Sequence, residues 1–94
     1  MGHMTVIISN DAVKVLKSIY DQQRAFNQQG YWPWQKHVKR EDIQNDVKIT
    51  DNERFYMALK ELHRNELIDS DDYHQTWDVT DDGHRFVDRY WDEK

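Results

Sequence analysis

The chain has no cysteine, a single proline and no long hydrophobic run among its 94 residues. Without cysteine it can build neither a disulfide framework nor a zinc site with thiolate ligands, so a reducing cytoplasm is the expected location. No apolar segment approaches the roughly 20 residues of a membrane-spanning helix, and no basic and apolar leader opens the sequence. We therefore expect neither a disulfide-stabilised secreted domain nor a helical membrane protein.

Enzyme signatures are also missing. The sequence contains no glycine-rich phosphate loop, no dinucleotide fingerprint and no H-E-x-x-H zinc motif. Its histidines are scattered, and His74 and His84, which lie among aspartates, lack the spacing of a recognised metal site. With no cysteine nucleophile and no serine in a motif, we expect no catalytic residue, no cofactor and no metal ion.

The length and composition favour one small folded domain. Charged residues make up 33% of the chain, but aromatic residues, at 13%, argue against disorder. Residues 1–3 are interpreted as a cloning scar, which assigns the domain to residues 4–94.

Negative charge is concentrated near the end of the chain. The formal net charge is −5, because residues 1–68 hold ten Lys or Arg and nine Asp or Glu, whereas residues 69–94 hold three and nine. Acidity argues against a nucleic-acid partner, but the local field on the docking face decides the outcome. The one dense basic segment spans residues 36–40, and it is either a phosphate-binding segment or an ordinary solvated loop.

The centre of the chain predicts two helices joined by a tight turn. Thr50 and Glu53 have the spacing of a capping box that starts the second helix, predicted over residues 51–66. Its apolar face repeats at helical spacing. The residues of this face are Phe55, Ala58, Leu59 and Leu62. The shorter helix before it offers Ile43 and Val47, four residues apart.

The flanking segments predict the other walls of a core. A first helix starts at a cap formed by Ser9 or Asn10 and ends at Gly30, the position of a C′ glycine, and Pro33 confirms the break. Its apolar face consists of Ala12, Val13, Leu16, Ile19, Tyr20 and Phe26. Val38 is expected in a very short strand. Residues 66–69 and 76–80 predict a β-hairpin, after which Thr80 caps a last helix. The apolar stripe of that helix is Phe86, Val87, Tyr90 and Trp91.

The order of these elements is that of a winged helix-turn-helix domain, mainly α with a small β-hairpin (α+β). Three segments resemble winged-helix regulators of the MarR and PadR type. They are residues 38–43 at the entry to the helix pair, 49–68 over the second helix and the next strand, and 77–83 at the end of the hairpin. These families often have glycine where Asn65 and Glu66 stand, and asparagine tolerates the left-handed turn that glycine would supply.

The resemblance implies a small prokaryotic, phage or plasmid regulator of transcription that binds double-stranded DNA with its second helix in the major groove. The candidate contact residues are Lys36, Lys39, Arg40, Asn52, Arg54, Tyr56 and Lys60. Asn52 can pair with adenine and Arg54 with guanine. Tyr56 and Lys60 can reach phosphates, and the basic segment 36–40 can hold the DNA backbone.

Carboxylates oppose this interpretation. Asp51 and Glu53 lie at the tip of the second helix, and the hairpin carries Asp69, Asp71 and Asp72, where phosphate would be repelled. The alternative is a protein-protein interaction module that uses its acidic hairpin and C-terminal helix to bind a basic partner.

Two aromatic groups also leave alternatives open. Residues 31–34, Tyr-Trp-Pro-Trp, either fold back on the core or form an exposed binding surface. Tyr90 and Trp91 either pack on the first helix of the same chain or join that helix in a homodimer surface.

Overall fold

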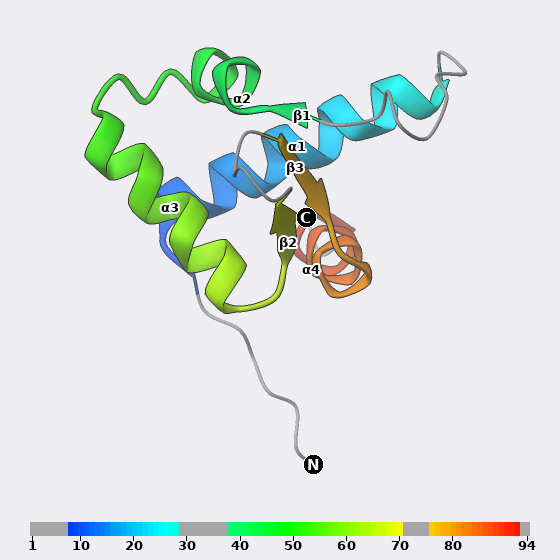
Figure 1. The fold of residues 1–94 in the computed structure, drawn as a ribbon. Coiled ribbons are helices and arrows are strands. Elements are labelled where there is room, and N and C mark those ends of the chain that lie inside the picture. The colour runs from blue at the N-terminus through cyan, green and yellow to red at the C-terminus, as the bar shows by residue number, and fades with distance from the viewer. Residues whose placement is uncertain (1–7, 29–37, 71–75, 93–94) are drawn as a thin grey trace.

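The computed structural model describes residues 8–28, 38–70 and 76–92 (Figure 1). In this part of the chain, four helices pack together with a small antiparallel sheet, which confirms the mainly α, α+β prediction. The elements, in order, are α1 (Asn10–Gln28), β1 (Val38–Lys39), α2 (Arg40–Val47), α3 (Asn52–Arg64), β2 (Ile68–Ser70), β3 (Thr76–Val79) and α4 (Asp81–Asp92).

The sheet has the strand order β1-β3-β2, so the last strand of the sequence is central. The predicted hairpin is confirmed, with Ile68 opposite Val79 and Ser70 opposite Trp77, while the connection 71–75 lies outside the described residues. The short strand at Val38 is also confirmed, and it pairs with Trp77 of β3. Trp77 is thus flanked on both sides by strand backbone in the middle of the sheet.

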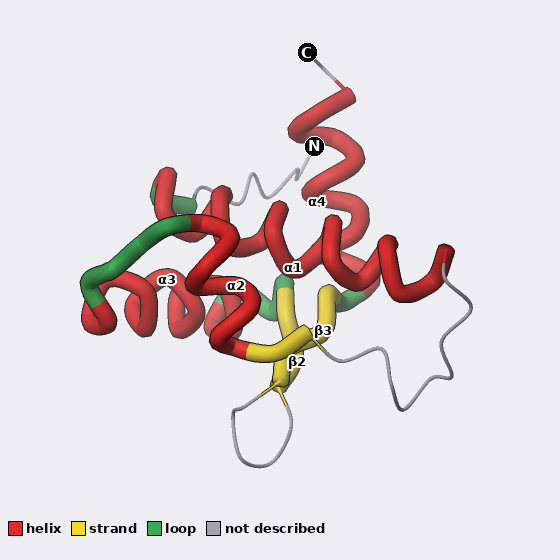
Figure 2. Tube along the Cα trace, turned by 90° about the horizontal axis from the view of Figure 1, so that it is seen from above, coloured by secondary structure: helices red, strands yellow, loops and turns green. Residues whose placement is uncertain are grey.

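The core forms around α1, which packs against α2, α3, α4 and β3. It crosses the middle of the molecule, with α4 projecting on one side and the strands on the other (Figure 2). All four apolar residues predicted for the inner face of α3 are buried. On α1, Ala12, Leu16 and Ile19 are fully buried as expected, and Val15, which the predicted face omitted, is buried beside them.

The helix starts agree with the sequence at two of three sites. The backbone N–H of Ala12 donates to Ser9 Oγ at 3.2 Å, and that of Gly83 donates to Thr80 Oγ1 at 3.0 Å, so Ser9 and Thr80 cap α1 and α4. Each cap satisfies a backbone donor that has no partner within its own helix.

The capping box predicted for α3 is wrong by one residue. Asp51 is the N-cap, and its carboxylate accepts from the backbone N–H groups of Glu53, at 2.9 Å, and Arg54, at 3.3 Å. An ionised carboxylate makes stronger hydrogen bonds than a threonine hydroxyl and also interacts favourably with the positive helix end. Asp51 therefore displaces Thr50 as the cap, and α3 begins at Asn52.

The end of α3 is also earlier than predicted, because the chain turns left-handed at Glu66, with φ 61°. The N–H of Leu67 donates to the Leu62 carbonyl and that of Glu66 to the His63 carbonyl, both at 3.0 Å. This pair of bonds is the Schellman motif, in which the left-handed position is usually glycine. The expected left-handed residue, Asn65, has an ordinary φ of −87°.

Glu66→Gly is therefore expected to stabilise the protein by about 0.5–1 kcal/mol. A residue with a Cβ is destabilised by about 1–2 kcal/mol in the left-handed conformation, and glycine removes this cost. Glycine also has more backbone freedom in the unfolded chain, and this cancels about half of the stabilisation. Asn65→Gly is the matched control, because it adds the same freedom where φ is negative and should destabilise. Urea unfolding of the three proteins measures the difference, and a loss of stability in Glu66→Gly would contradict the prediction.

Candidate nucleic-acid interface

The solvent side of α3 divides into two flanks. Tyr56 and Met57 are its large exposed hydrophobic residues, with 52% and 58% of their surfaces exposed. Neighbouring residues of a helix point about 100° apart, so these two side chains mark different flanks. One flank faces β3 and the start of α2, whereas the other faces the start of α1.

A pocket of about 210 Å³ lies on the first flank and is called the Arg40 pocket below. Its walls come from the first residue of α2, from α3 and from β3. The lining residues are Arg40, Tyr56, Leu59, Lys60, His63 and Trp77. The pocket therefore brings together cationic and aromatic side chains from three elements, and none of these lining residues is acidic.

Contacts inside this flank hold the charged groups near aromatic rings. Lys60 Nζ lies 6.0 Å from the centre of the Tyr56 ring, and Arg40 Cζ lies 6.0 Å from the buried Phe55 ring. His63 meets Trp77 edge-on, with ring centroids 6.4 Å apart. Rings at these distances attract cations without neutralising them. The flank keeps its positive charge and offers apolar surface beside it, a combination that suits phosphate and base contacts.

The structure brings three of the seven candidate DNA-contact residues into this pocket: Arg40, Tyr56 and Lys60. Lys39 is exposed directly before Arg40, on β1, and Lys36 lies outside the described residues. His63 and Trp77 were not among the candidates. The spacing of 56, 60 and 63 on one helix would have pointed to His63, whereas only the sheet pairing brings Trp77 to the pocket.

Asn52 has a role within the fold. Its side-chain oxygen accepts from Gln44 Nε2 at 2.7 Å, and the same Gln44 nitrogen donates to the Ile49 carbonyl at 3.1 Å. Gln44 thereby joins α2, the turn and the start of α3. Asn52 remains exposed, but one of its polar atoms is engaged in bracing the turn.

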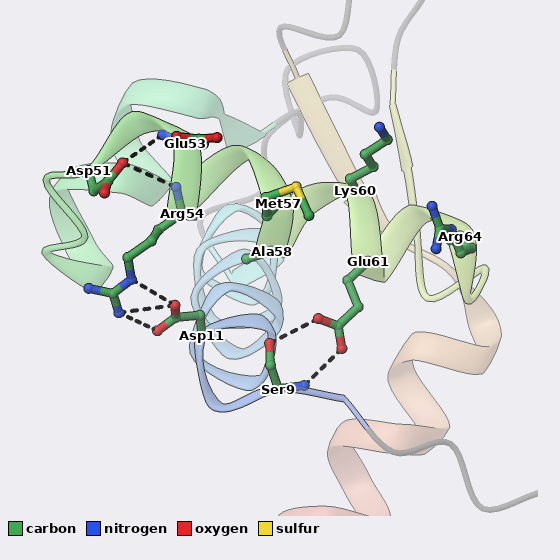
Figure 3. Close-up of a pocket in the computed structure, with 10 residues that line it drawn as sticks. All are labelled: Ser9, Asp11, Asp51, Glu53, Arg54, Met57, Ala58, Lys60, Glu61 and Arg64. Atoms are coloured by element: carbon green, nitrogen blue, oxygen red, sulfur yellow. Dashed lines mark hydrogen bonds and ion pairs between the residues drawn. The ribbon is translucent and has the colours of Figure 1, made fainter.

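Arg54 lies on the opposite flank of α3. Its Nη2 donates to both carboxylate oxygens of Asp11, at 2.8 and 3.0 Å, and its Nε donates to Asp11 Oδ2 at 3.1 Å (Figure 3). These hydrogen bonds lower the pKa of Asp11 and raise the pKa of Arg54. The guanidinium is thus turned toward α1 and away from the Arg40 pocket.

A groove of about 490 Å³ runs along this second flank and is called the Met57 groove below. Besides Arg54 and Asp11, a second contact links its two sides, because Glu61 accepts from the Ser9 backbone N–H at 2.8 Å and from Ser9 Oγ at 2.9 Å. Asp51 and Glu53, the acids at the tip of α3, line this groove and not the Arg40 pocket (Figure 3).

Asp11→Asn tests what the pair with Arg54 contributes to folding. The folded-state pKa of Asp11 is below the ordinary 3.8, so its contribution is present above that value and is lost as the pH falls through the lowered pKa. We expect wild type to be more stable than Asp11→Asn at about pH 6, and the difference to shrink toward about pH 2. Urea unfolding across this range measures the effect.

The control for this experiment is the same substitution in an Arg54→Gln background. If the hydrogen bonds from Arg54 cause the effect, Asp11→Asn should then change the stability much less at about pH 6. An unchanged difference between the two backgrounds would assign the effect to another group.

The last helix packs on α1 of the same chain. Tyr20 meets His84 edge-on with ring centroids 5.3 Å apart, and its hydroxyl donates to Asp88 Oδ1 at 3.3 Å. Phe86 and Tyr90 stack at 5.9 Å, and 36% of the Tyr90 surface is exposed. The side chain of Trp91 and residues 31–34 lie outside what is described. Of the three hairpin aspartates, only Asp69 is described, and it is exposed on β2.

Neither a metal-binding cluster nor a membrane-spanning helix is present within the described ranges. Among these residues, no three His, Cys, Asp or Glu side chains gather in a way that would hold a metal ion. In the same ranges, no helix combines the length and the apolar character needed to cross a membrane. Comparisons of the chain with protein families, with curated proteins and with solved structures found no match.

Proposed function

We propose that the chain is a small winged-helix DNA-binding protein, a transcriptional regulator similar to the MarR and PadR type, that occupies a site on double-stranded DNA and performs no catalysis. The observation that carries this proposal is the Arg40 pocket, where Arg40, Lys60 and Tyr56 converge beside the exposed face of α3. The order helix, strand, two helices, hairpin, helix and the sheet order β1-β3-β2 support the winged-helix assignment.

In this proposal α3 enters the major groove, and cations on its flank hold the DNA backbone. Lys39 and Arg40 sit at the junction of β1 and α2, where the basic segment 36–40 meets the helix pair. Arg40 begins α2 and Lys60 belongs to α3, so the two cations reach the Arg40 pocket from different helices and can each contact a phosphate. Tyr56 lines the same pocket and can donate its hydroxyl to a phosphate or place its ring against a base methyl group.

The position of the acidic residues favours the same face. Asp51 is engaged with two backbone N–H groups of its own helix, and Glu53 lies in the Met57 groove on the other flank. Phosphate approaching from the Arg40 side therefore meets cations first. Coulomb energy falls with distance and with screening by salt, so Arg40 and Lys60, which line the pocket, act on such a phosphate more strongly than Asp51 and Glu53, which do not line it.

A second candidate is a protein-interaction module that binds a basic partner. Asp81, Asp82 and Asp88 are exposed on α4 and Asp69 on β2, so exposed carboxylates outnumber the exposed cations Arg85 and Arg89 on these two elements. The exposed Tyr90 gives the same helix an apolar contact, which a homodimer could also use. The two candidates use different faces and can be separated by one titration.

Fluorescence anisotropy with a random duplex tests the DNA proposal. At about 50 mM salt we expect binding in the micromolar range, and log K should fall linearly with log salt at a slope of about −0.9 for each phosphate contact. No binding at tens of micromolar, or binding without salt dependence, would rule the proposal out. A labelled polylysine peptide that bound under the same conditions would then support the protein-interaction module.

A further inference from the structure

One flank of α3 carries a stripe of exposed residues with charge of opposite sign at its two ends. Glu53, Met57, Lys60 and Arg64 all line the Met57 groove and follow one another at spacings of four, three and four residues. Such spacing places them in one row along a helix. The row begins with an acid, has a methionine near its middle and ends with two bases (Figure 3).

This row is complementary to itself when it is reversed. Glu53 and Arg64 are equally far from the midpoint between Ala58 and Leu59, and the same holds for Met57 and Lys60. In an antiparallel pair of α3 helices, Glu53 of each copy therefore faces Arg64 of the other. Met57 faces the aliphatic stem of Lys60, which can cover apolar surface while its ammonium stays in water. A two-fold axis through the midpoint repeats every contact twice.

We propose that the Met57 groove is the docking surface for a second copy of this chain, which pairs its α3 antiparallel to the first. The positive C-terminal end of each row then meets the negative N-terminal end of the other. The antiparallel arrangement also places each helix N-terminus near the C-terminus of its neighbour, which the helix dipoles favour.

The charged side chains that pair between the two copies are exposed and available for contact. Glu53, Lys60 and Arg64 are exposed, and among the described residues none of the three forms an ion pair within the chain. The other charged groups of the groove wall are already engaged, since Arg54 binds Asp11 and Glu61 binds Ser9. The charged side chains of the row that remain available are Glu53 at one end and Lys60 and Arg64 toward the other.

One like-charge contact opposes the pairing. The same register places Asp51 of one copy near Glu66 of the other, and both are acidic. Asp51 is the weaker partner in this repulsion, because two backbone N–H groups and the positive end of α3 already hold its carboxylate. The Glu53–Arg64 attraction therefore prevails, and the repulsion lowers the affinity without reversing it.

The size of the surface makes the pairing weak. Contact through one helix of 13 residues buries less than the roughly 1,200–2,000 Å² of a stable interface. A dimer held by exposed charge pairs over so small an area forms at high protein concentration and dissociates as salt rises. The dimer also covers Lys60, which lines the Arg40 pocket as well, so pairing and DNA binding exclude each other. The pairing itself does not depend on the DNA proposal.

Sedimentation equilibrium of the full chain without DNA tests this surface by charge exchange. Wild type should show a dimer at about 0.1–1 mM protein in about 50 mM salt, which dissociates at about 0.5 M salt. Glu53→Lys and Arg64→Glu should each raise the dissociation constant about tenfold, because each places like charges opposite each other twice. The double variant Glu53→Lys/Arg64→Glu should recover to within about threefold of wild type, because the pairs are restored with reversed sign.

Circular dichroism of each variant checks that these exposed substitutions leave the fold intact. A wild type that stays monomeric throughout the concentration range overturns the proposal, as does a double variant no better than the single ones. A dimer that survives Glu53→Lys but is lost in Tyr90→Ser also overturns it and moves the interface to α4.

Discussion

Replacing Arg40 and Lys60 together by alanine is expected to weaken duplex DNA binding about 100-fold at about 50 mM salt. Each phosphate contact releases about 0.9 of a counterion, which at this salt concentration is worth roughly tenfold in affinity. The slope of log K against log salt should become less steep by about 1.8 for the same reason. Fluorescence anisotropy across a salt series measures both quantities.

The matched control is Arg85→Ala with Arg89→Ala. It removes the same number of positive charges, but from exposed positions on α4, away from the Arg40 pocket. If long-range net charge governed binding, both double variants would lose affinity equally. If the Arg40 pocket is the binding site, the affinity of the α4 variant should stay within about threefold of wild type.

Arg54→Ala tests whether Arg54 contacts DNA, as the sequence predicted, or stays bound to Asp11, as in the structure. The sequence placed Arg54 opposite guanine, but its guanidinium is bound to Asp11 on the other flank of α3. We expect a smaller loss of DNA affinity than for either Arg40→Ala or Lys60→Ala alone. A loss comparable to theirs would mean that Arg54 leaves Asp11 to reach the DNA.

Gly83→Ala is expected to destabilise the fold by about 3 kcal/mol. An added Cβ would clash with the backbone carbonyl oxygen of Leu67 and would lie 2.6 Å from Val79 Cγ1. The Leu67 oxygen cannot move freely, because it accepts the N–H of Thr80 at 3.1 Å. The methyl group would therefore push the first turn of α4 away from the hairpin.

Helix propensity alone predicts that Gly83→Ala would stabilise the protein. Alanine is about 1 kcal/mol better than glycine inside a helix, so an increase in stability would follow if the site had room. Arg85→Ala supplies the control, because Arg85 is exposed on the same helix and its ion pair with Asp82 is a surface contact of little weight. Urea unfolding should separate the two variants, and a Gly83→Ala protein as stable as wild type would contradict the close packing.

Local patterns in the sequence predicted most of the fold. Helical spacing identified the whole buried face of α3, and the hairpin was found from alternation across a polar stretch. The errors were also local: Asp51 displaced Thr50 as cap, and Glu66 took the left-handed position in place of Asn65. In both cases two adjacent residues could take the same position, and the sequence pattern did not distinguish between them.

Contacts between distant parts of the chain could not be predicted from the sequence. Nothing near Arg54 indicates that Asp11, more than forty residues earlier, will bind its guanidinium. The position of Trp77 beside Arg40 likewise depends on the pairing of β1 with β3, a ladder between segments with two helices between them. The sequence therefore predicted only part of the candidate site. It indicated the cationic residues, but the tertiary fold determines which of them lie together.

The strand order has a consequence for synthesis on the ribosome. Because β3 lies between β1 and β2, neither of those strands has its ladder partner until residues 76–79 have left the exit tunnel. Val38 and Ile68, both fully buried in the finished sheet, stay open to solvent and to chaperones until then. A nascent chain that stops before β3 contains α1, α2 and α3 but cannot close its core, so the fold is completed only after residues 76–79 have emerged.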